Sequence, residues 1–368
     1  MKLICEGLDL SDATLKVIKA TATRTTNPIL EGIKLKAEND ELILSATDLE
    51  LSIEKKIKAD VKIEGEVVVP GKFFSEFIKK LTNEKIEISD NEENNLLKIK
   101  YTDSESFIQC MPASEFPKPM EIESPDTFEI TKQNLKDSIN RTIFSASVDD
   151  SRPILKGVLC EIENFKLTVV ALDGFRIAIC SKKIKSYSNK ISFIVPSRSL
   201  SEISKILEDN DEIVKVEVQK NIIRFILGTT KITSRLLDGE FFDFKPFIPK
   251  DIKTKITVTK NMLEDSLERA NLLARMNKNN LVTFDIKDKT LIVSSDSDMG
   301  KIVEKITISI EGKDLIIAFN ARYFSECLRY INDEYININF NSPISPCTIT
   351  STNNDDYLYL ILPVKIIG

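Results

Sequence analysis

One thirteen-residue pattern occurs three times in this chain and constrains the fold more than any other feature of the sequence. It begins at Val69, Val195 and Phe319, and each copy resembles the end of a strand, a turn and an amphipathic helix. Apolar residues recur at spacings of three and four, which places them on one face of a helix. These residues are Phe74, Phe77, Ile78 and Leu81, then Leu200, Ile203 and Leu207, then Phe324, Cys327, Leu328 and Ile331. Only Ser204 interrupts the apolar stripe.

Shorter motifs repeat with the same period. Pro28-Ile-Leu matches Pro153-Ile-Leu, and Asp48 matches Asp173, with Asp296 following in the last third of the chain. A period of about 125 residues is far longer than that of solenoid repeats, so the pattern indicates three copies of one domain. Polar segments that follow prolines suggest where the copies end. The predicted domains are residues 1–122, 123–250 and 251–368.

Each copy is predicted to contain two helices and about eight strands. In the first domain we expect helices near residues 10–21 and 72–81. Segments such as Lys98-Ile-Lys-Tyr have the period of two that is typical of half-buried strands. The expected strands are residues 2–6, 29–37, 41–46, 49–59, 66–69, 85–89, 96–101 and 106–111. Many strands with few helices favour an α+β fold, in which helices back antiparallel sheets.

The composition is that of a globular protein and removes several kinds of chemistry. Of 368 residues, 42% are hydrophobic and 29% are charged, with a net charge of −6. The chain has no histidine, which removes histidine bases, histidine metal sites and Ser-His or Cys-His nucleophiles. No glycine-rich phosphate loop is present either, and we expect no cofactor. Carboxylates could still hold magnesium, so catalysis is not excluded by composition.

The sequence also predicts a cytoplasmic protein. Charges near the N-terminus argue against a signal peptide, and no apolar run approaches the ~20 residues of a membrane helix. The six cysteines are too far apart for a metal knuckle or a redox pair. Free thiols in apolar surroundings are typical of a reducing compartment.

Recurrent basic residues face away from the apolar stripe of the predicted helices. The second helix of each domain carries two, and the first carries one. They are Lys72, Lys79, Arg198, Lys205, Arg322 and Arg329 on the second helices, and Lys16, Arg141 and Arg269 on the first. Acids at Glu76, Glu202 and Glu326 share the second-helix faces, as on an ordinary solvated surface. Recurrence of the basic pair instead favours a surface that holds the phosphates of a polyanion.

The first helix of each domain offers a simpler interpretation of its basic residue. An acid lies four positions before each of these bases, at Asp12, Asp137 and Asp265. Pairs in this order stabilise a helix by ~0.2–0.5 kcal/mol each. Helix stabilisation and ligand contact both remain open for these positions.

Four motifs, together with the triplication, carry a resemblance that covers the whole chain. The motifs are Arg24-Thr-Thr-Asn-Pro-Ile-Leu30, Asp150-Ser-Arg-Pro-Ile-Leu-Lys-Gly157, Ala171-Leu-Asp-Gly-Phe-Arg-Ile177 and Leu360-Ile-Leu-Pro-Val-Lys-Ile366. The chain resembles the bacterial DNA polymerase III beta subunit, the replicative sliding clamp. The resemblance implies a non-catalytic, head-to-tail homodimer that closes a ring around duplex DNA, with helices inside and sheets outside. It also implies DNA contacts at Arg24 and Arg152.

The resemblance further implies a hydrophobic pocket between domains 2 and 3 that receives short peptide motifs. Its partners would be the DNA polymerase III alpha subunit, the clamp loader and other proteins with clamp-binding motifs. By resemblance the pocket consists of Leu155, Leu172, Gly174, Phe175, Arg176, Ile177, Phe242, Pro246, Phe247, Asn320, Tyr323, Ile344, Pro346, Leu360, Leu362, Pro363, Val364, Lys365 and Ile366. Leu172, Phe175, Phe242 and Pro246 depart from the commoner family residues and imply a more apolar, reshaped pocket.

Residues of the ring interface are also implied by the resemblance alone. Phe107 and Ile108 lie on a late strand of domain 1, and Leu272 and Leu273 lie in domain 3. Phe107 lies one position away from where the resemblance leads us to expect an interface residue.

Two other functions compete with the clamp. The carboxylates of Asp48, Asp173, Asp296 and Asp298 could serve a metal-dependent phosphodiesterase, although the first three recur at domain spacing and would not gather around one metal pair. The other alternative is a scaffold ring that never meets DNA.

Overall fold

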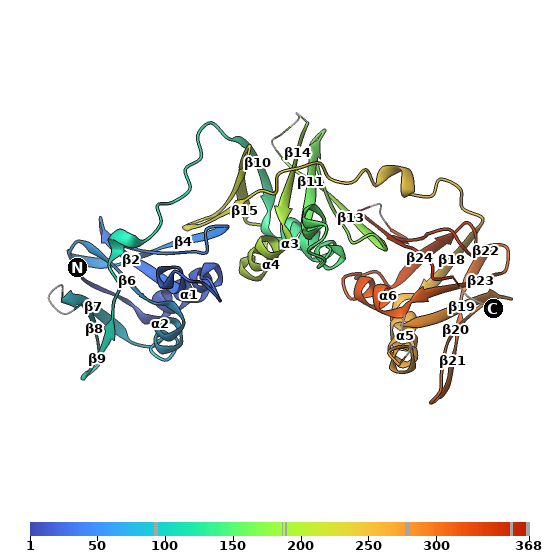
Figure 1. Cartoon of the computed structure of the whole chain (residues 1–368), viewed down its shortest axis with the longest axis horizontal. Coiled ribbons are helices and arrows are strands. Elements are labelled where there is room, and N and C mark those ends of the chain that lie inside the picture. Colours follow the sequence, from blue (N-terminus) through green and yellow to red (C-terminus); the bar gives the residue numbers. More distant parts are fainter. Residues whose placement is uncertain (92–94, 186, 188–189, 277–279, 354–355, 366–368) are drawn as a thin grey trace. The chain divides into compact units, whose positions relative to one another are not determined.

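The computed structural model describes residues 1–91, 95–185, 187, 190–276, 280–353 and 356–365. The chain forms two compact units: unit 1 is residues 1–132 and 205–236, and unit 2 is residues 133–204 and 237–368 (Figure 1). The described residues form six α-helices and strands β1 to β26, and the paired strands are antiparallel. The predicted α+β fold is confirmed. No helix in the described part is both long and apolar enough to cross a membrane.

Unit 1 contains two antiparallel sheets and helices α1 (Gly7–Val17) and α2 (Gly71–Ile78). Helix α1 packs on strands β3 and β4 and against α2. The first sheet has the order β5-β1-β7-β8-β9, and the second β10-β15-β16-β17-β4-β3-β2-β6. The strands are β1 (Lys2–Glu6), β2 (Gly32–Glu38), β3 (Glu41–Thr47), β4 (Leu51–Lys58), β5 (Asp60–Ile63), β6 (Gly65–Pro70), β7 (Lys85–Asn91), β8 (Leu96–Tyr101), β9 (Ser104–Gln109), β10 (Asp126–Thr131), β15 (Ile213–Gln219), β16 (Ile222–Leu227) and β17 (Thr230–Arg235).

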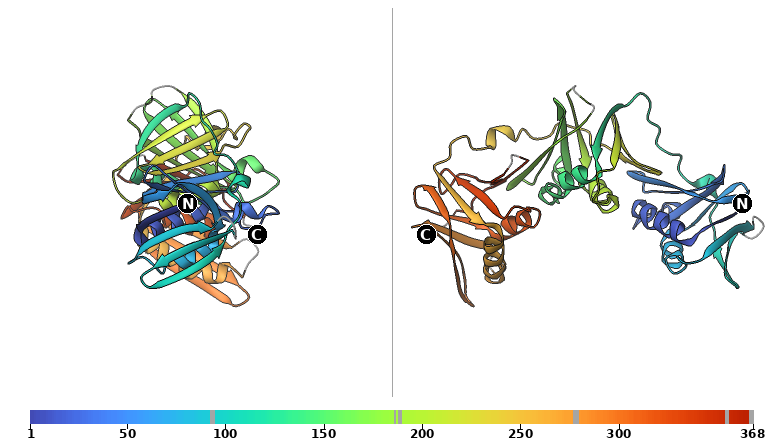
Figure 2. Two further views of the ribbon diagram at one scale, coloured as in Figure 1. Left: turned by 90° about the vertical axis from the view of Figure 1, so that its left-hand side faces the viewer. Right: turned by 180° about the vertical axis from the view of Figure 1, so that it is seen from behind.

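Unit 2 also contains two antiparallel sheets. Their orders are β14-β11-β12-β13-β26-β25-β24-β18-β22 and β21-β20-β19-β23. Helix α5 (Lys260–Ala274) packs on β20 and β21 and lies beside α6 (Ala321–Leu328), as the views of Figure 2 show. The strands are β11 (Gly157–Glu163), β12 (Lys166–Leu172), β13 (Arg176–Lys183), β14 (Ile191–Pro196), β18 (Thr254–Thr259), β19 (Leu281–Lys287), β20 (Thr290–Ser297), β21 (Gly300–Thr307), β22 (Ser309–Gly312), β23 (Leu315–Asn320), β24 (Tyr335–Phe340), β25 (Cys347–Ser351) and β26 (Tyr357–Ile361).

The remaining helices, α3 (Lys132–Asn140) and α4 (Ser197–Ile206), begin or end at the division between the units. The one polar residue that interrupts the predicted apolar stripes lies on α4. Ser204 is buried, and its hydroxyl donates to the amide oxygen of Asn140 at 2.6 Å. The partner on the neighbouring helix satisfies the hydroxyl, so the serine does not leave an unpaired polar group in the core.

The predicted apolar stripes are buried. Phe74 and Phe324 are fully buried, and Phe77 is half-buried. Burying each such side chain stabilises the fold by about 1.5–3 kcal/mol relative to leaving it exposed. The buried set is Phe74, Ile78, Leu81, Leu200, Ile203, Leu207, Phe324, Cys327, Leu328 and Ile331.

Two sheets join strands of adjacent predicted domains. Strand β17 pairs with β4, with Ser234 opposite Leu51. Strand β26 pairs with β13 in the same way, with Ile361 opposite Arg176. Backbone hydrogen bonds therefore hold neighbouring repeats together, and the two compact units do not coincide with three repeats. The three-domain division stays a prediction from the sequence period.

Several element ends differ from the sequence prediction. The first helix begins earlier, at Gly7, where an added Cβ would lie 2.0 Å from the carbonyl oxygen of Leu81. It ends at Val17 and continues as a 3-10 turn over Ile18–Ala20. The segment predicted as one strand over residues 49–59 is β4, followed by the separate strand β5. Strand β5 is short, Asp60–Ile63, and its alternation of polar and apolar residues covers too few positions to define a separate strand.

Candidate nucleic-acid interface and peptide site

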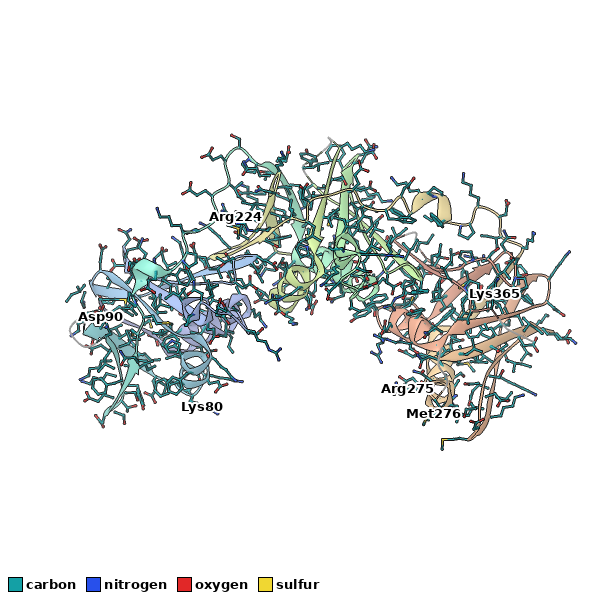
Figure 3. All side chains as sticks on the ribbon, viewed as in Figure 1. Lys80, Asp90, Arg224, Arg275, Met276 and Lys365 are labelled. Carbon is teal, nitrogen blue, oxygen red and sulfur yellow. The ribbon has the colours of Figure 1, made fainter. Side chains whose placement is uncertain are left out.

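The second helix of each repeat presents its predicted basic residues to solvent. Lys72 on α2 and Lys79 directly after it are exposed, while Phe74 and Ile78 on the other face are buried. The remaining four, Arg198, Lys205, Arg322 and Arg329, are exposed as well. Figure 3 draws the described side chains and labels Lys80, a further exposed lysine that follows α2. Exposed ammonium and guanidinium groups on regular helices suit the phosphates of a polyanion.

The basic residues of the first helices are held closer to the protein. The ammonium of Lys16 pairs with Asp12 at 2.9 Å, and both are on α1. The guanidinium of Arg141 pairs with Asp137 at 2.7 Å and lies 5.1 Å from the ring centre of Tyr357. Two of the three predicted i, i+4 pairs are therefore present, and they restrain both bases.

The third predicted ion pair, between Asp265 and Arg269, is replaced by an ion pair with a residue more distant in the sequence. Arg269 does not pair with Asp265 in the described structure but donates to Glu304 of β21, with Nε at 2.9 Å and Nη2 at 2.7 Å. This two-pronged geometry matches the guanidinium fork to both carboxylate oxygens. Helix α5 packs on β21, so the strand supplies a better-placed acceptor than the helix itself.

The two predicted loop arginines, Arg24 and Arg152, are both exposed. Arg152 precedes the 3-10 turn Pro153–Lys156. Its Nη1 is 3.3 Å from the position of a Cβ added to Gly174, whose φ of +93° a larger side chain would adopt only with strain. Arg152 therefore reaches the turn that begins the predicted peptide site.

Part of the predicted peptide site forms one apolar cluster in unit 2. Leu155, Leu172, Ile177 and Leu360 are buried together, and Leu362 packs against them. Leu172 and Ile177 come from adjacent strands β12 and β13, and Leu360 comes from β26, which pairs with β13. Sheet pairing therefore gathers residues from distant parts of the sequence.

Other predicted pocket residues are exposed apolar side chains. The exposed fractions of Phe175, Phe242 and Phe247 are 59%, 48% and 51%, and that of Ile344 is 75%. The rings of Phe242 and Phe247 lie 5.2 Å apart. Phe242 and Phe247 thus form an exposed apolar pair, the kind of feature from which interaction surfaces are built.

The sequence prediction missed Phe244, which is buried in the apolar cluster. Phe241 and Ile248 pack against the same cluster, whereas Phe242 and Phe247 point to solvent. Alternation around Asp243 would place Phe242 and Phe244 on the same face, so the local sequence carries no signal that separates the buried residue from the exposed one. Phe244 anchors the segment that carries the exposed phenylalanines.

Arg176 is a buried structural centre of the site. Its Nε donates to Asp173 at 2.9 Å and its Nη2 to the carbonyl oxygen of Phe144 at 2.6 Å, and Nη1 pairs with Glu326. The guanidinium carbon lies 4.6 Å from the ring centre of Tyr323. Burial alone would lower the pKa of Arg176, but the neighbouring Tyr359, Glu326 and Asp173 outweigh it and raise the pKa. Arg176 therefore stays charged and orders its surroundings.

Tyr323 connects this centre to the surface. Its ring stacks on exposed Phe175, with ring centres 6.3 Å apart. Asn320 caps α6 by accepting a hydrogen bond from the Arg322 backbone N–H at 3.0 Å. These contacts fix the start of α6 beside the turn that holds Phe175.

The chain after β26 continues along the site. The backbone N–H of Leu362 donates to Phe175 at 2.9 Å, and that of Val364 donates to Ala318 at 2.8 Å. Pro363, lying between them, has no N–H to satisfy. Lys365 is exposed, Pro346 is half-buried, and Ile366 lies outside the described residues.

The predicted interface residues differ in exposure. Phe107 on β9 is 56% exposed, whereas Ile108 is buried in unit 1. On α5, Leu272 is 62% exposed and Leu273 is half-buried. Phe107 and Leu272 are thus the side chains available to a second copy. Strand β9 is also at the edge of its sheet.

The recurrent aspartates stabilise turns. The Asp48 carboxylate accepts from the backbone N–H groups of Glu50 and Leu51 at 3.0 and 2.8 Å. Asp173 does the same for Phe175 and Arg176 at 2.9 and 3.1 Å. Within the described ranges, no group of three or more His, Cys, Asp or Glu residues is arranged to hold a metal ion.

Comparisons with known proteins agree along the whole chain. Models of the DNA polymerase III beta subunit match in order: the N-terminal domain at residues 1–120, the central domain at 129–243 and the C-terminal domain at 245–365. The beta sliding clamp of Bacillus subtilis strain 168 is 34% identical, over 99% of this chain and 100% of that protein.

Solved structures give the same result. A crystal structure of the DNA polymerase sliding clamp from Bacillus subtilis superposes with a TM-score of 0.96 at 33% identity, covering all of both chains. A putative DNA polymerase III beta subunit from Eubacterium rectale superposes with a TM-score of 0.95 at 34% identity, again over both full chains.

Proposed function

This chain belongs to the DNA polymerase III beta subunit family, and we propose that it is a non-catalytic sliding clamp that keeps DNA polymerase III on duplex DNA. Two copies, joined head to tail, would encircle the duplex. The observation that carries the proposal is the match of all three family domains, in order, over essentially the full chain. A clamp of this kind works on the bacterial chromosome, in the cytoplasm.

The exposed basic residues support the part of the proposal that concerns DNA. Six arginines and lysines occupy equivalent positions on α2, α4 and α6 or directly after them, and all are exposed. Such groups attract phosphates regardless of base sequence, which lets a protein move along DNA. None of these helices needs to enter a groove, because phosphate contacts alone carry no sequence information.

The apolar surface of unit 2 supports the part that concerns partner proteins. Exposed Phe175, Phe242 and Phe247 surround a buried apolar cluster, and Arg176 and Tyr323 hold the turn beneath Phe175. An extended peptide with apolar anchors would cover these rings. We propose that the polymerase alpha subunit, the clamp loader and other motif-bearing proteins bind here.

A topological assay tests the function. The labelled protein is loaded onto nicked circular DNA with a clamp loader and the complex is isolated. The circle is then cut once. A sliding ring stays on the closed circle and leaves through the new ends, so loss of the protein only after cutting is expected. Retention on the linear product, or metal-dependent cleavage of the circle, would contradict the proposal.

A further inference from the structure

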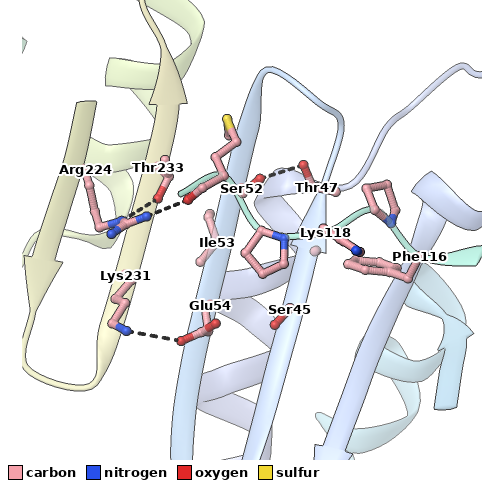
Figure 4. A pocket seen from close by; sticks show the side chains of 14 residues that line it. Ser45, Thr47, Ser52, Ile53, Glu54, Phe116, Lys118, Arg224, Lys231 and Thr233 are labelled. Atoms are coloured by element: carbon pink, nitrogen blue, oxygen red, sulfur yellow. Dashed lines mark hydrogen bonds and ion pairs between the residues drawn. The ribbon is translucent and has the colours of Figure 1, made fainter. Parts of the chain in front are cut away.

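A pocket of about 140 Å³ lies on the surface of unit 1, well separated in sequence from the apolar cluster described above (Figure 4). Strands β3, β4, β16 and β17 line one side, and the segment 116–120 lines the other. Pro117 and Pro119 lack an N–H and favour an extended backbone. Arg224 donates from Nη2 to the carbonyl oxygen of Met120 at 2.6 Å, which holds the end of this segment in place.

The pocket occupies the same place in the repeat as the apolar site of unit 2. Leu51 of β4 pairs with Ser234 of β17, just as Arg176 of β13 pairs with Ile361 of β26. The segment after Phe116 corresponds to the segment after Phe241, because Glu115-Phe116 and Glu240-Phe241 are matching motifs. In each unit, strands of two adjacent repeats therefore pair within one sheet, which we call the sheet junction, and a connecting segment lies beside that junction.

The two junctions differ in chemistry at equivalent positions. Where unit 2 has Leu172, Ile177 and Leu360, unit 1 has Thr47, Ser52 and Thr233. These shorter polar side chains do not fill the space under the segment, so a pocket remains. Ser52 donates to Thr47 at 2.6 Å, and Arg224 Nε donates to Thr233 at 3.2 Å. These hydrogen bonds preorganise the polar part of the lining, and Ile53, Phe116 and Met120 contribute to an apolar part.

The charges around the pocket favour an anionic group. Lys118, Arg224 and Lys231 line it, with Glu54 as the one acid among the lining residues. Lys231 is only loosely paired, with its ammonium 3.7 Å from Glu54. Lys118 is exposed and makes no hydrogen bond or ion pair with another described residue. Glu217, 3.6 Å from Arg224, offsets that residue as Glu54 offsets Lys231, which leaves the charge of Lys118 uncompensated among the described lining residues.

The size of the pocket limits its occupant. Since a water molecule takes about 30 Å³ of the liquid, the space equals roughly four to five waters, which suits one side chain. We infer that the pocket binds a carboxylate side chain of an acidic, extended peptide segment in a partner protein. We assign the carboxylate to a peptide because the equivalent place in unit 2 is the proposed peptide site. The inference therefore rests on that part of the proposed function. The hydroxyl and basic groups that the pocket has in place of the aliphatic side chains of unit 2 make it selective for a different residue type.

Methionine methyl resonances of the full chain provide the test. Of six methionines, Met120 lines the pocket, and its signal is assigned with Met120→Leu. The probe is acetyl-Ala-Glu-Glu-Ala-amide, and the neutral control is acetyl-Ala-Gln-Gln-Ala-amide. We expect the acidic peptide alone to shift the Met120 signal saturably. No shift, or an equal shift with the neutral peptide, would overturn the inference. Glutarate binding as tightly as the peptide would also overturn it, because the occupant would then be a free carboxylate.

Variants locate the binding. Lys231→Gln and Lys118→Gln should each weaken binding of the acidic peptide by roughly five-fold, the upper range for a partly exposed ion pair. Lys56→Gln is the matched control, since Lys56 is on β4 but does not line the pocket. Equal weakening by all three would show a general charge effect and overturn the inference.

A separate experiment distinguishes failure of the carboxylate-pocket inference from failure of the proposed function. The apolar peptide acetyl-Ala-Leu-Phe-Leu-Ala-amide should bind unit 2 and be weakened by Phe175→Ala, leaving the Met120 response unchanged. If this peptide fails to bind while Met120 still responds, the unit 2 site is wrong and the carboxylate pocket stands. The reverse result overturns only the carboxylate pocket.

Discussion

Glu326 explains why an acid is useful among the basic residues of a helix that is proposed to meet DNA. One of its carboxylate oxygens pairs with buried Arg176, and the other accepts from Arg322 Nε at 2.6 Å. Glu326 therefore links the turn of the peptide site to an exposed arginine of α6. Its counterpart Glu76 is exposed and has no ion pair with another described residue. The recurrent acid thus has a structural role in the third repeat that the first repeat does not share.

Replacing Glu326 with Gln should destabilise the protein by about 1.5–3 kcal/mol, the range for hydrogen bonds to charged groups. Arg176 would lose a charged acceptor while remaining buried. Urea unfolding at pH 7 measures the change. Glu76→Gln is the control and should stay within about 0.5 kcal/mol of the parent. Equal losses for both variants would contradict the assigned role.

The same residue predicts a pH dependence. Burial pulls the pKa of Glu326 upward, but hydrogen bonds from Arg322 and Arg176 outweigh it, so the folded-state pKa is lowered. The stability from this group is then fully present above the unfolded-state pKa of about 4.3, and is lost as the pH falls through the lower folded-state value. The difference between the parent and Glu326→Gln should therefore be largest at pH 7 and shrink below pH 4. A constant difference would argue against the ion pairs.

At the scale of elements, each second helix separates two tasks between its faces. The buried face packs Phe74, Leu200 or Phe324 into the core, and the opposite face carries a pair of exposed bases. On the first helices, Lys16, Arg141 and Arg269 are all paired with acids, and Arg322 of α6 is paired with Glu326 as well. The helices differ in exposure: the Arg322 side chain is 67% exposed, against 20% for Lys16 and 14% for Arg141, so the second helices are the stronger candidates for DNA contact.

Charge reversal tests this assignment. The combined variant Lys72→Glu, Arg198→Glu and Arg322→Glu should load poorly on nicked circles. Its affinity should also depend less on salt, because each phosphate contact contributes about 0.9 to the slope of log K against log salt concentration. Binding between 50 and 200 mM salt, roughly the range over which such contacts are resolved, is the measurement.

The control changes the same amount of charge on strands. Lys58, Lys100 and Lys287 are exposed residues of β4, β8 and β19, and all three are replaced by Glu. If this control impairs loading as much as the helix variant, net charge and not helix position determines binding.

At the scale of the whole molecule, the proposed ring requires two copies. Phe107 at an edge strand of unit 1 and Leu272 on α5 of unit 2 are large apolar residues in solvent. A head-to-tail arrangement would bring one of each together twice in a closed dimer. Burying them would remove apolar surface that a lone chain exposes.

Leu272→Arg and Phe107→Arg should therefore yield monomers of 41.6 kDa, while the parent has twice that mass. An arginine in an apolar contact would have to lose its water without a partner. Light scattering coupled to gel filtration measures the mass. Val148→Arg is the control, since Val148 is 93% exposed and outside the proposed contact. A monomeric parent, or a monomeric control, would contradict the assigned interface.

The sequence by itself determined the repeated architecture, because periodicity is a local property. The spacing of Phe74 and Ile78 specifies which helix face is buried, and the same spacing in the other copies specifies the same fold three times. Two of the three pairs predicted within a helix, Asp12–Lys16 and Asp137–Arg141, are present. The family motifs added the expected site residues.

The tertiary structure decided what depends on distant segments. Arg269 pairs with Glu304 of β21 and not with Asp265 of its own helix. Phe244 is buried in the apolar cluster, whereas Phe242 is exposed. Strand pairing across the repeats also set apolar Leu172 and polar Thr47 at equivalent junctions. Sequence spacing cannot give these contacts, because they depend on where separate elements come together, from 35 residues apart for Arg269 and Glu304 to much further apart for β13 and β26. The repeat fixed three similar frameworks, and long-range packing made their surfaces different.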